Sequence, residues 1–423
     1  MIMKYIYNNI VNYIFKYIVL LGLVLSSVGL LAQTPLQVYQ DTAAINNPGI
    51  QALFKQYEVV MQKVPQSSSL PDPTFGFGYF INSVETRIGP QQAVLSVSQS
   101  FPWFGKLGAQ EQATTERALA VLEKVNDERS KLNFKVAATY NSLYVLRSAV
   151  IITDKNIVLL STFRDLSRVR FESGKGSMVD VLRLEMELKE LENQLLYLQD
   201  SRRPLIAEFE QLLNTEILQP LEFPEKLPSD ELSMSKELII DSVQSLSPVI
   251  LSLEHELLSY DHDVIAAQKK GGPSFTVGLN YTIVGELSSY AGSDNGRDAI
   301  LPTIGMTIPL YRKNYSAQIK EKAISRESVA FRKVEKKNDL ATRLERGFFE
   351  YDDAIRRVSL NEQLIEYAKQ AMDIMIAEYT SSETNFEEVI RMDRKLLNYE
   401  LELEQARADQ NTAVAFVDYL MGK

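Results

Sequence analysis

One uninterrupted helix-forming segment constrains this sequence more than any other feature. Residues 106–170 contain no proline and only one internal glycine, Gly108. With a rise of about 1.5 Å per residue, a helix of this length measures about 100 Å, which no compact domain of this size needs. Apolar residues recur within it at the spacings of three and four that are typical of one helix face: Leu132, Val136, Tyr140, Leu143, Leu146 and Val150. The segment therefore predicts a very long helix with a coiled-coil seam.

The chain also aligns with itself. The segment FESGKGSMVDVLRLEMEL at 171–188 matches YTSSETNFEEVIRMDRKL at 379–396, and 379 minus 171 gives an offset of 208. Arg183 falls on Arg391 at this offset, and both segments keep the same apolar spacing. We interpret the chain as one structural unit written twice.

Prolines upstream follow the same duplication. Pro73 matches Pro273 at an offset of 200 and Pro102 matches Pro309 at 207, so the second copy carries seven more residues, which we place in the loop at 285–299. The expected organisation is a signal peptide at 1–32, repeat 1 at 33–219, a linker or equatorial segment at 220–240 and repeat 2 at 241–423. In repeat 1 the long helices should cover about 105–214 with a tip near 171–180, and in repeat 2 about 312–421 with a tip near 379–388.

Each copy contains two short runs in which apolar and small polar residues alternate, a period of two that predicts β-strands. We expect a β-hairpin at about 73–101 and another at about 273–309, with strands of about ten residues, which is long enough for a tilted strand to cross a bilayer. The face between the apolar residues consists of Ser, Thr, Gly and Asn, which suits a wet lumen. Soluble hairpins packed on another element are the alternative. The apolar residues of these alternating runs are Phe75, Phe77, Tyr79, Ile81, Leu95, Val97, Phe275, Val277, Leu279, Tyr281, Ile283, Ile304, Met306 and Ile308.

The N-terminus has the features of a cleavable signal peptide. An apolar run at 17–31 follows Lys4 and Lys16, and Ala32 offers a small residue for cleavage. An anchoring helix is disfavoured because the run is shorter than the ~20 residues that a span needs. The sequence has no cysteine, so we expect neither a disulfide nor a lipid anchor on an N-terminal cysteine, and its net charge of -10 argues against a nucleic-acid partner.

Four strands cannot close a barrel, and unpaired strand edges are not tolerated in lipid. The chain is therefore expected to oligomerise, and three copies would give a 12-stranded barrel, although two or four copies also close on paper. The fold class that we expect is a mixed α/β membrane protein: two β-hairpins per protomer contribute to a trimeric outer-membrane β-barrel that is continuous with a long α-helical coiled-coil barrel.

Four segments together resemble the outer membrane efflux protein family typified by TolC. They are LPDPTFGFGY at 70–79, SQSFPWFGKLGAQ at 98–110, GKGSMVDVL at 174–182 and GMTIPLYRKNYSAQIKEKA at 305–323. The resemblance covers essentially the whole chain after the signal peptide. It implies a homotrimeric channel-tunnel in the cell outer membrane that extends into the periplasm and docks on a periplasmic adaptor (membrane fusion) protein and an inner-membrane pump. It also implies a passive duct for efflux or secretion, with no enzyme activity, cofactor or metal.

The family closes its tunnel at the periplasmic tip with acidic residues, and this implies gate candidates here. By position Glu388 matches the first acidic residue of the motif, whereas Arg391 stands where a second acid is expected. Their repeat mates are Asp180 and Arg183. The alternative is that each acid and arginine form a helix-surface ion pair at i, i+3, or that Asp180 only favours a helix N-terminus.

Turn-forming residues near the tips are the candidates for adaptor contact. They are Gly174, Gly176 and Ser177 in the first copy and Ser381, Ser382 and Asn385 in the second. Ordinary turn chemistry explains these residue types equally well. The expected strand–helix hinges are Pro73, Pro102, Gly105, Pro273 and Pro309, because proline fixes φ and removes a hydrogen-bond donor.

Other candidates carry less weight. His255 and His262 lie seven residues apart, but two histidines without a third ligand do not make a metal site. Trp103 and Phe104 suit either the interfacial rim of a barrel or burial against a neighbouring helix. A structural or adhesive coiled-coil envelope protein and a passive porin are the alternative functions. The first leaves the proline-bounded strands unexplained, and porins consist mainly of strands.

Overall fold

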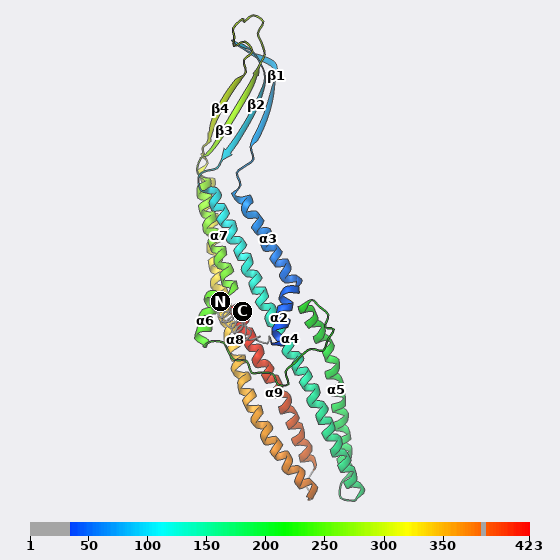
Figure 1. Ribbon diagram of the computed structural model, residues 1–423. Coiled ribbons are helices and arrows are strands. Elements are labelled where there is room, and N and C mark those ends of the chain that lie inside the picture. The colour runs from blue at the N-terminus through cyan, green and yellow to red at the C-terminus, as the bar shows by residue number, and fades with distance from the viewer. Residues whose placement is uncertain (1–33, 382–385) are drawn as a thin grey trace, which may run out of the picture. The chain divides into compact units, whose positions relative to one another are not determined.

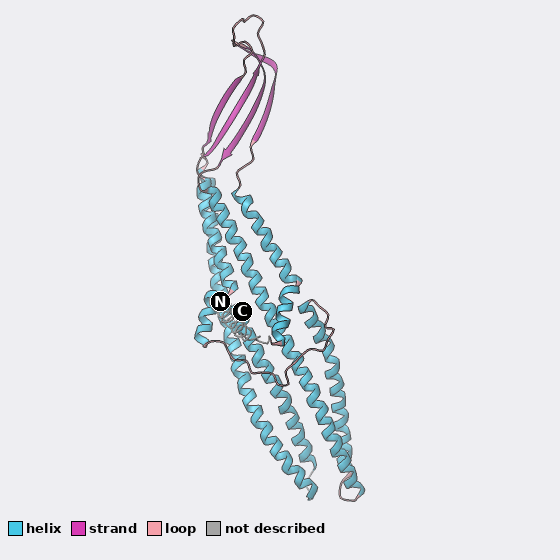
Figure 2. Cartoon of the chain, in the orientation of Figure 1, coloured by secondary structure: helices cyan, strands magenta, loops and turns pink. Residues whose placement is uncertain are grey.

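The computed structural model describes residues 34–381 and 386–423, so the predicted signal peptide at 1–32 lies outside the described residues. These residues form helices and one β-sheet (Figure 1, Figure 2). A helix pair, a β-hairpin and a second helix pair follow one another twice along the chain. In order, the elements are α2 (Pro35–Asn46), α3 (Pro48–Ser68), β1 (Thr74–Thr86), β2 (Gly89–Phe101), α4 (Lys106–Glu172), α5 (Met178–Leu213), α6 (Lys236–Leu246), α7 (Pro248–Lys270), β3 (Ser274–Val284), β4 (Ala299–Thr307), α8 (Arg312–Ser381) and α9 (Phe386–Met421).

The long helix predicted from residue 106 is present. Helix α4 runs for 67 residues without interruption, and α8 runs for 70. Helix α5 ends at Asn214, which adopts the left-handed conformation with φ of 49° and donates its backbone N–H to the Glu210 carbonyl. Gly422 follows α9 with φ of 85°. Asparagine and glycine tolerate this conformation better than other residues, which explains why α5 and α9 end there.

The four strands form one antiparallel sheet in the order β1-β2-β3-β4, so the two hairpins lie side by side (Figure 2). Strands β1 and β2 each have 13 residues, which is longer than the expected ten, and their pairing shifts register between Tyr79 and Val84. Strands β3 and β4 have 11 and 9 residues. Strands β1 and β4 are the two edges of the sheet.

The register aligns the apolar residues across the sheet in rows. Phe77 pairs with Leu95, Leu95 with Tyr281, and Tyr281 with Ile300. The next row of the ladder contains Gly76, Ser96 and Asn280 and ends at Leu301. Because neighbouring positions point to opposite faces, one face is apolar and the other is rich in small polar residues. The apolar face is exposed within the protomer: Phe75 is 82% and Ile304 is 83% accessible.

Close packing on the polar face explains its small residues. A Cβ atom on Gly76 would lie 2.4 Å from the Ser96 hydroxyl oxygen, and one on Gly278 would lie 2.7 Å from the Thr303 hydroxyl oxygen. Larger side chains at these two positions would displace their cross-strand neighbours.

The chain divides into two compact units, and each draws residues from both predicted repeats. One unit comprises residues up to Asn47, Leu132–Glu231 and Glu350–Ala415. Its main core joins α4, α5, α8 and α9. The buried residues are Leu160, Phe163, Leu184, Leu188, Leu191, Met372, Tyr379, Val389, Ile390 and Leu397.

An irregular segment between α5 and α6 is bound to the helices of this unit by side-chain hydrogen bonds. The Asn411 side chain accepts from the Asp230 N–H at 2.9 Å and donates to the Pro228 carbonyl at 2.8 Å. The buried Tyr144 hydroxyl accepts from the Leu227 N–H at 3.0 Å and donates to Glu404 at 2.6 Å. These bonds explain why a proline-rich segment without secondary structure has a defined path.

The other unit comprises Pro48–Lys131, Leu232–Phe349 and Phe416–Lys423, and it contains the sheet. The buried Ser252 hydroxyl of α7 donates to the Ala120 carbonyl of α4 at 2.8 Å. His255 contacts Glu116 at 2.7 Å. Among the described residues, no helix combines the length and the apolar character needed to cross a membrane.

Candidate functional site

The turn between α4 and α5 contains the first group of predicted tip residues. Gly174 has φ of 75°, and the Lys175 N–H donates to the Arg170 carbonyl at 2.8 Å, which closes the end of α4. A Cβ atom on Gly176 would lie 3.1 Å from the Arg170 Cβ atom. The Ser177 hydroxyl accepts from the Val179 N–H at 3.1 Å and caps α5. All three residues therefore have a local structural role in the turn.

The second group of predicted tip residues is only partly described. Ser381 is the last residue of α8, whereas Ser382 and Asn385 lie outside the described residues. Helix α9 begins at Phe386 and carries Glu387 and Glu388 in its first turn, where negative charge is favourable.

Two of the four predicted gate residues, Glu388 and Arg391, form an ion pair with each other. Glu388 accepts from Arg391 of the same helix at 2.6 Å, at the i, i+3 spacing of a surface ion pair. Arg183 does not pair with the preceding Asp180, but reaches from α5 to Glu387 of α9 at 3.3 Å. Asp180 lies in the first turn of α5.

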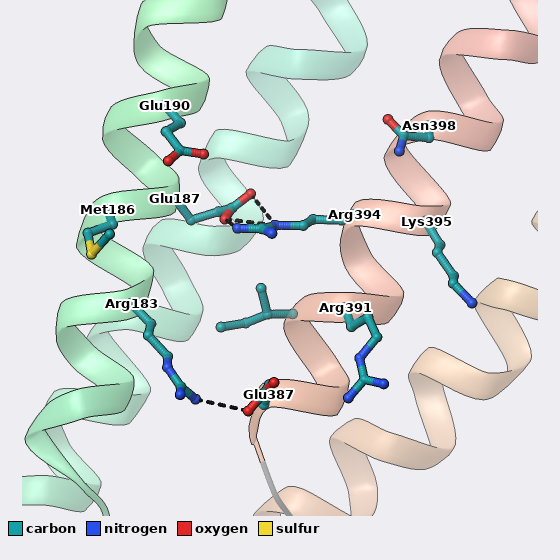
Figure 3. A pocket seen from close by; sticks show the side chains of 10 residues that line it. Arg183, Met186, Glu187, Glu190, Glu387, Arg391, Arg394, Lys395 and Asn398 are labelled. Atoms are coloured by element: carbon teal, nitrogen blue, oxygen red, sulfur yellow. Dashed lines mark hydrogen bonds and ion pairs between the residues drawn. The ribbon is translucent and has the colours of Figure 1, made fainter.

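Side chains of α5 and α9 line a pocket of about 490 Å³ at this end of the helices (Figure 3). Its lining carries four cationic and three acidic side chains, so most of the residues that line the pocket are charged. The lining residues are Arg183, Met186, Glu187, Glu190, Glu387, Ile390, Arg391, Arg394, Lys395 and Asn398.

The ion pair of the pocket with the most hydrogen bonds joins Glu187 and Arg394. The Arg394 Nε donates to both carboxylate oxygens of Glu187 at 2.8 Å, and its Nη2 donates as well (Figure 3). The Glu187 side chain is 9% accessible, whereas that of Arg394 is 57% accessible. The arginine thus neutralises a carboxylate that is largely removed from water.

A buried acid lies beside this pair. Asp393 is 1% accessible, and both of its carboxylate oxygens accept from the Asn156 Nδ2 at 3.0 and 3.1 Å. Burial raises the pKa of Asp393 to about 6, with a further rise from Glu187 and Glu400, while the Asn156 hydrogen bond and Arg394 oppose the change. The buried Oδ1 of Asn156 has no hydrogen-bond partner among the described residues.

Sequence reasoning did not single out Glu187, Glu387, Arg394, Asp393 or Asn156. The sequence does contain a sign of one of them. Asp393 lies three residues after Ile390 and four before Leu397, so the spacing of this helix face places an acid among buried apolar residues. The others lie beside seams, where charged residues are ordinary. Among the described residues, no group of three or more His, Cys, Asp or Glu side chains could hold a metal ion.

The predicted hinges lie at the strand–helix junctions. Pro73 and Pro273 immediately precede β1 and β3, Pro102 directly follows β2, and Pro309 lies between β4 and α8. Gly105 precedes α4 with φ of 76°, a conformation that favours glycine.

Trp103 packs at the junction of α7 and β3. A Cβ atom on Gly272 would lie 2.6 Å from the indole ring, and the ring stacks on Phe275 with centroids 6.1 Å apart. The aromatic ring therefore needs the glycine at that position.

No family model and no curated protein matches the sequence. Solved structures do match the fold. The chain is similar to CusC, whose structures concern folding and transmembrane channel formation, with a TM-score of 0.73 and 14% identity over 91% of this chain and 91% of that chain.

Two further outer membrane proteins are similar to a comparable degree. For the open state of the Neisseria gonorrhoeae MtrE outer membrane channel, the TM-score is 0.72 at 15% identity, over 92% of this chain and 88% of that chain. For the outer membrane protein VceC of Vibrio cholerae, it is 0.71 at 15% identity, over 92% and 96%. The resemblance found in the sequence is confirmed at the level of the fold, and the chain has the fold of these outer membrane channels.

Proposed function

We propose that this protein is an outer membrane channel that serves as the exit duct of a tripartite efflux or secretion system. The observation that carries the proposal is the sheet register, which gathers exposed apolar side chains on one face and mainly Ser, Thr, Gly and Asn on the other, where Val94 and Leu301 are apolar exceptions. An apolar outer face suits lipid and a small polar inner face suits a water-filled pore. The fold similarity over about nine-tenths of the chain supports the same role.

The active form is a homotrimer with a 12-stranded barrel. Strands β1 and β4 each have one edge without a partner strand in the protomer, and lipid does not tolerate such edges. A neighbouring copy supplies the missing pairing on both sides. The repeated element order supports the duplicated unit, with repeats at about 33–219 and 241–423, and the first helix of the second copy, α6, begins at Lys236 inside the segment predicted as a linker.

The protein is located in the outer membrane and extends into the periplasm. The turn at 173–177 and the end of α8 at Ser381 belong to the periplasmic tip, where an adaptor protein and an inner-membrane pump engage it. The compact capping of the first turn, with Gly174 at φ of 75° and Ser177 as the N-cap, supports a surface of defined shape for such a partner.

The gate lies at the same tip. Glu388 and Asp180 supply acidic groups, and Arg391 and Arg183 moderate their charge. The 2.6 Å pairing of Glu388 with Arg391 and the pairing of Arg183 with Glu387 favour a mixed ring of charges over a doubled acidic ring.

Outer-membrane fractionation, heat-modifiable migration and crosslinking test the duct itself. A trimer in the outer-membrane fraction that copurifies with an adaptor is expected. A soluble monomer would contradict the proposal, and a trimer that never copurifies with an adaptor would favour a passive porin.

Conductance in a planar bilayer tests the gate. We expect Glu388→Ala to change conductance and cation preference, because the variant removes an acid from the constriction. Glu327→Ala removes an exposed glutamate of α8 outside this pocket, so it is the charge-matched control and should leave conductance and selectivity unchanged. Unchanged conductance and selectivity in Glu388→Ala would remove this residue from the gate.

A further inference from the structure

The junction between the sheet and the helices has an unusual charge distribution. Residues 98–110, 264–285 and 299–320 contain no Asp or Glu but six basic residues, in a chain whose 55 acidic residues outnumber its 45 basic ones. These segments are the chain on either side of the hinges. The six basic residues are Lys106, Lys269, Lys270, Arg312, Lys313 and Lys320.

Side-chain contacts bring the ends of α4, α7 and α8 together at this point. Arg312 at the start of α8 donates to the Gly271 carbonyl after α7 at 3.3 Å, and Lys270 donates to Gln318 at 3.0 Å. A Cβ atom on Gly105 would lie 3.9 Å from the Lys269 Cε. Burial lowers the pKa of Lys106, and the positive charge of Lys270 lowers it further.

Exposed apolar side chains adjoin the cations. Phe104 precedes Lys106 by two residues and is 75% accessible, and Leu310 and Tyr311 precede Arg312 and are 76% and 85% accessible. We call Lys106, Lys269, Lys270, Arg312 and Lys313, together with these three side chains, the junction patch. The patch therefore combines a cationic surface with an apolar one at the boundary of the sheet.

Acidic groups around the junction patch are few or already paired. On α7, Asp263 pairs with Arg117 and Asp261 pairs with Arg326 at 2.6 Å. Glu111 on α4 and Glu321 on α8 lie beyond the acid-free segments, and Glu321 pairs with Lys322 at 3.0 Å. Asp72, two residues before β1, is a further acid near the start of that strand.

We propose that the junction patch binds the headgroup of an anionic phospholipid. The proposal rests on the proposed function, because it requires the sheet to be embedded in a bilayer. The lipid phosphate lies among the cationic side chains, and the acyl chains lie along the exposed aromatic residues toward the apolar sheet face. The cationic side chains complement the charge of a lipid phosphate, and the adjoining apolar side chains can contact its acyl chains. A free anion would contact only the cations, so the patch favours a lipid.

The test compares lipid preference in reconstituted full-length protein. The protein is placed in phosphatidylcholine vesicles, and the association of trace spin-labelled phosphatidylglycerol is compared with that of spin-labelled phosphatidylcholine. We expect wild type to prefer phosphatidylglycerol by about fivefold or more, the factor that one basic residue near an anionic headgroup supplies. Lys269→Gln with Lys270→Gln should bring the preference close to parity.

A matched control is available on α8. Lys336→Gln with Lys337→Gln also removes two adjacent lysines, but away from the junction, and should retain the wild-type preference. Salt of about 1 M should weaken the wild-type preference, because it screens exposed charges strongly. This measurement needs no variant, so it tests the proposal even if the double variant folds poorly.

Failure of the lipid site and failure of the proposed duct give different results. Protein that inserts and conducts without preferring phosphatidylglycerol, or whose preference is equal in the two double variants, overturns this inference and leaves the duct intact. Loss of the preference in millimolar inorganic phosphate would show a site for free phosphate and would also overturn it. Protein that neither inserts nor conducts overturns the proposed function and this inference with it.

Discussion

Replacing Asp393 by asparagine is expected to stabilise the protein at alkaline pH. The substitution keeps the shape of the side chain and removes a buried negative charge. It also provides an N–H donor for the Asn156 Oδ1, which has no partner among the described residues in the wild type. Both effects favour the folded state of the variant.

The magnitude follows from the pKa of Asp393. The folded-state pKa is about 6 and the ordinary value is 3.8, a difference of about 2 units that corresponds to about 3 kcal/mol. Because the pKa is raised, the folded state binds more protons than the unfolded state between about pH 4 and pH 6. The ionised carboxylate therefore destabilises the folded state above pH 6, and this destabilisation fades as the pH falls from 6 toward 3.8.

Thermal unfolding of both proteins between pH 4 and pH 8 measures the effect. We expect Asp393→Asn to be more stable by about 3 kcal/mol at pH 8 and by about half of that at pH 5. For a chain of 423 residues that unfolds cooperatively, the difference at pH 8 corresponds to about 3 °C in Tm. Asp154→Asn on an exposed part of α4 is the control and should change stability by less than about 0.5 kcal/mol.

Two results would refute this reasoning. If the difference between Asp393→Asn and wild type does not change with pH, the carboxylate does not titrate in the folded state near pH 6. If the variant is less stable than wild type at pH 8, the ionised form is stabilised by its neighbours Arg394 and Asn156 more than burial disfavours it.

Three further substitutions test other parts of the structure by unfolding measurements. Arg394→Met should cost about 1–3 kcal/mol, because it leaves the buried Glu187 carboxylate without its cation, although the exposure of the arginine moderates the loss. Gly174→Ala should cost about 1 kcal/mol, because φ of 75° disfavours a side chain. Tyr144→Phe should cost about 1–3 kcal/mol, because it leaves the Leu227 N–H and Glu404 without their buried partner.

Each of these has a matched control in the same chain. Adding Glu187→Gln to Arg394→Met should recover part of the loss, and additive losses would show that the two side chains do not interact. Gly108→Ala, inside α4 with open space around its Cβ position, should stabilise by about 1 kcal/mol, opposite in sign to Gly174→Ala. Tyr197→Phe on exposed α5 should be neutral, and an equal loss in both tyrosine variants would contradict the role of Tyr144.

For the gate candidates, the sequence predicted an ion pair within one helix but not a partner on another helix. Glu388 and Arg391 were expected as a possible i, i+3 pair, and the structure forms that pair. Arg183 occupies the matching position in the first copy, yet it binds Glu387 on another helix. Equivalent positions in a repeated pattern face different neighbours, so their partners depend on which helices pack together.

The amino-acid sequence by itself determined the strands, the long helices and the junctions between them. Alternation in β1, spacing of three and four in α5, and the hinges at Pro102 and Gly105 are local constraints on backbone and solvent, which act whatever the rest of the chain does. Only the tertiary structure decided that Asp393 is buried against Asn156, that Arg394 neutralises Glu187, and that the cations of three helix ends meet at the junction patch. These contacts join residues 41 to 237 positions apart, and no local pattern specifies which distant helix face an ionisable side chain will meet.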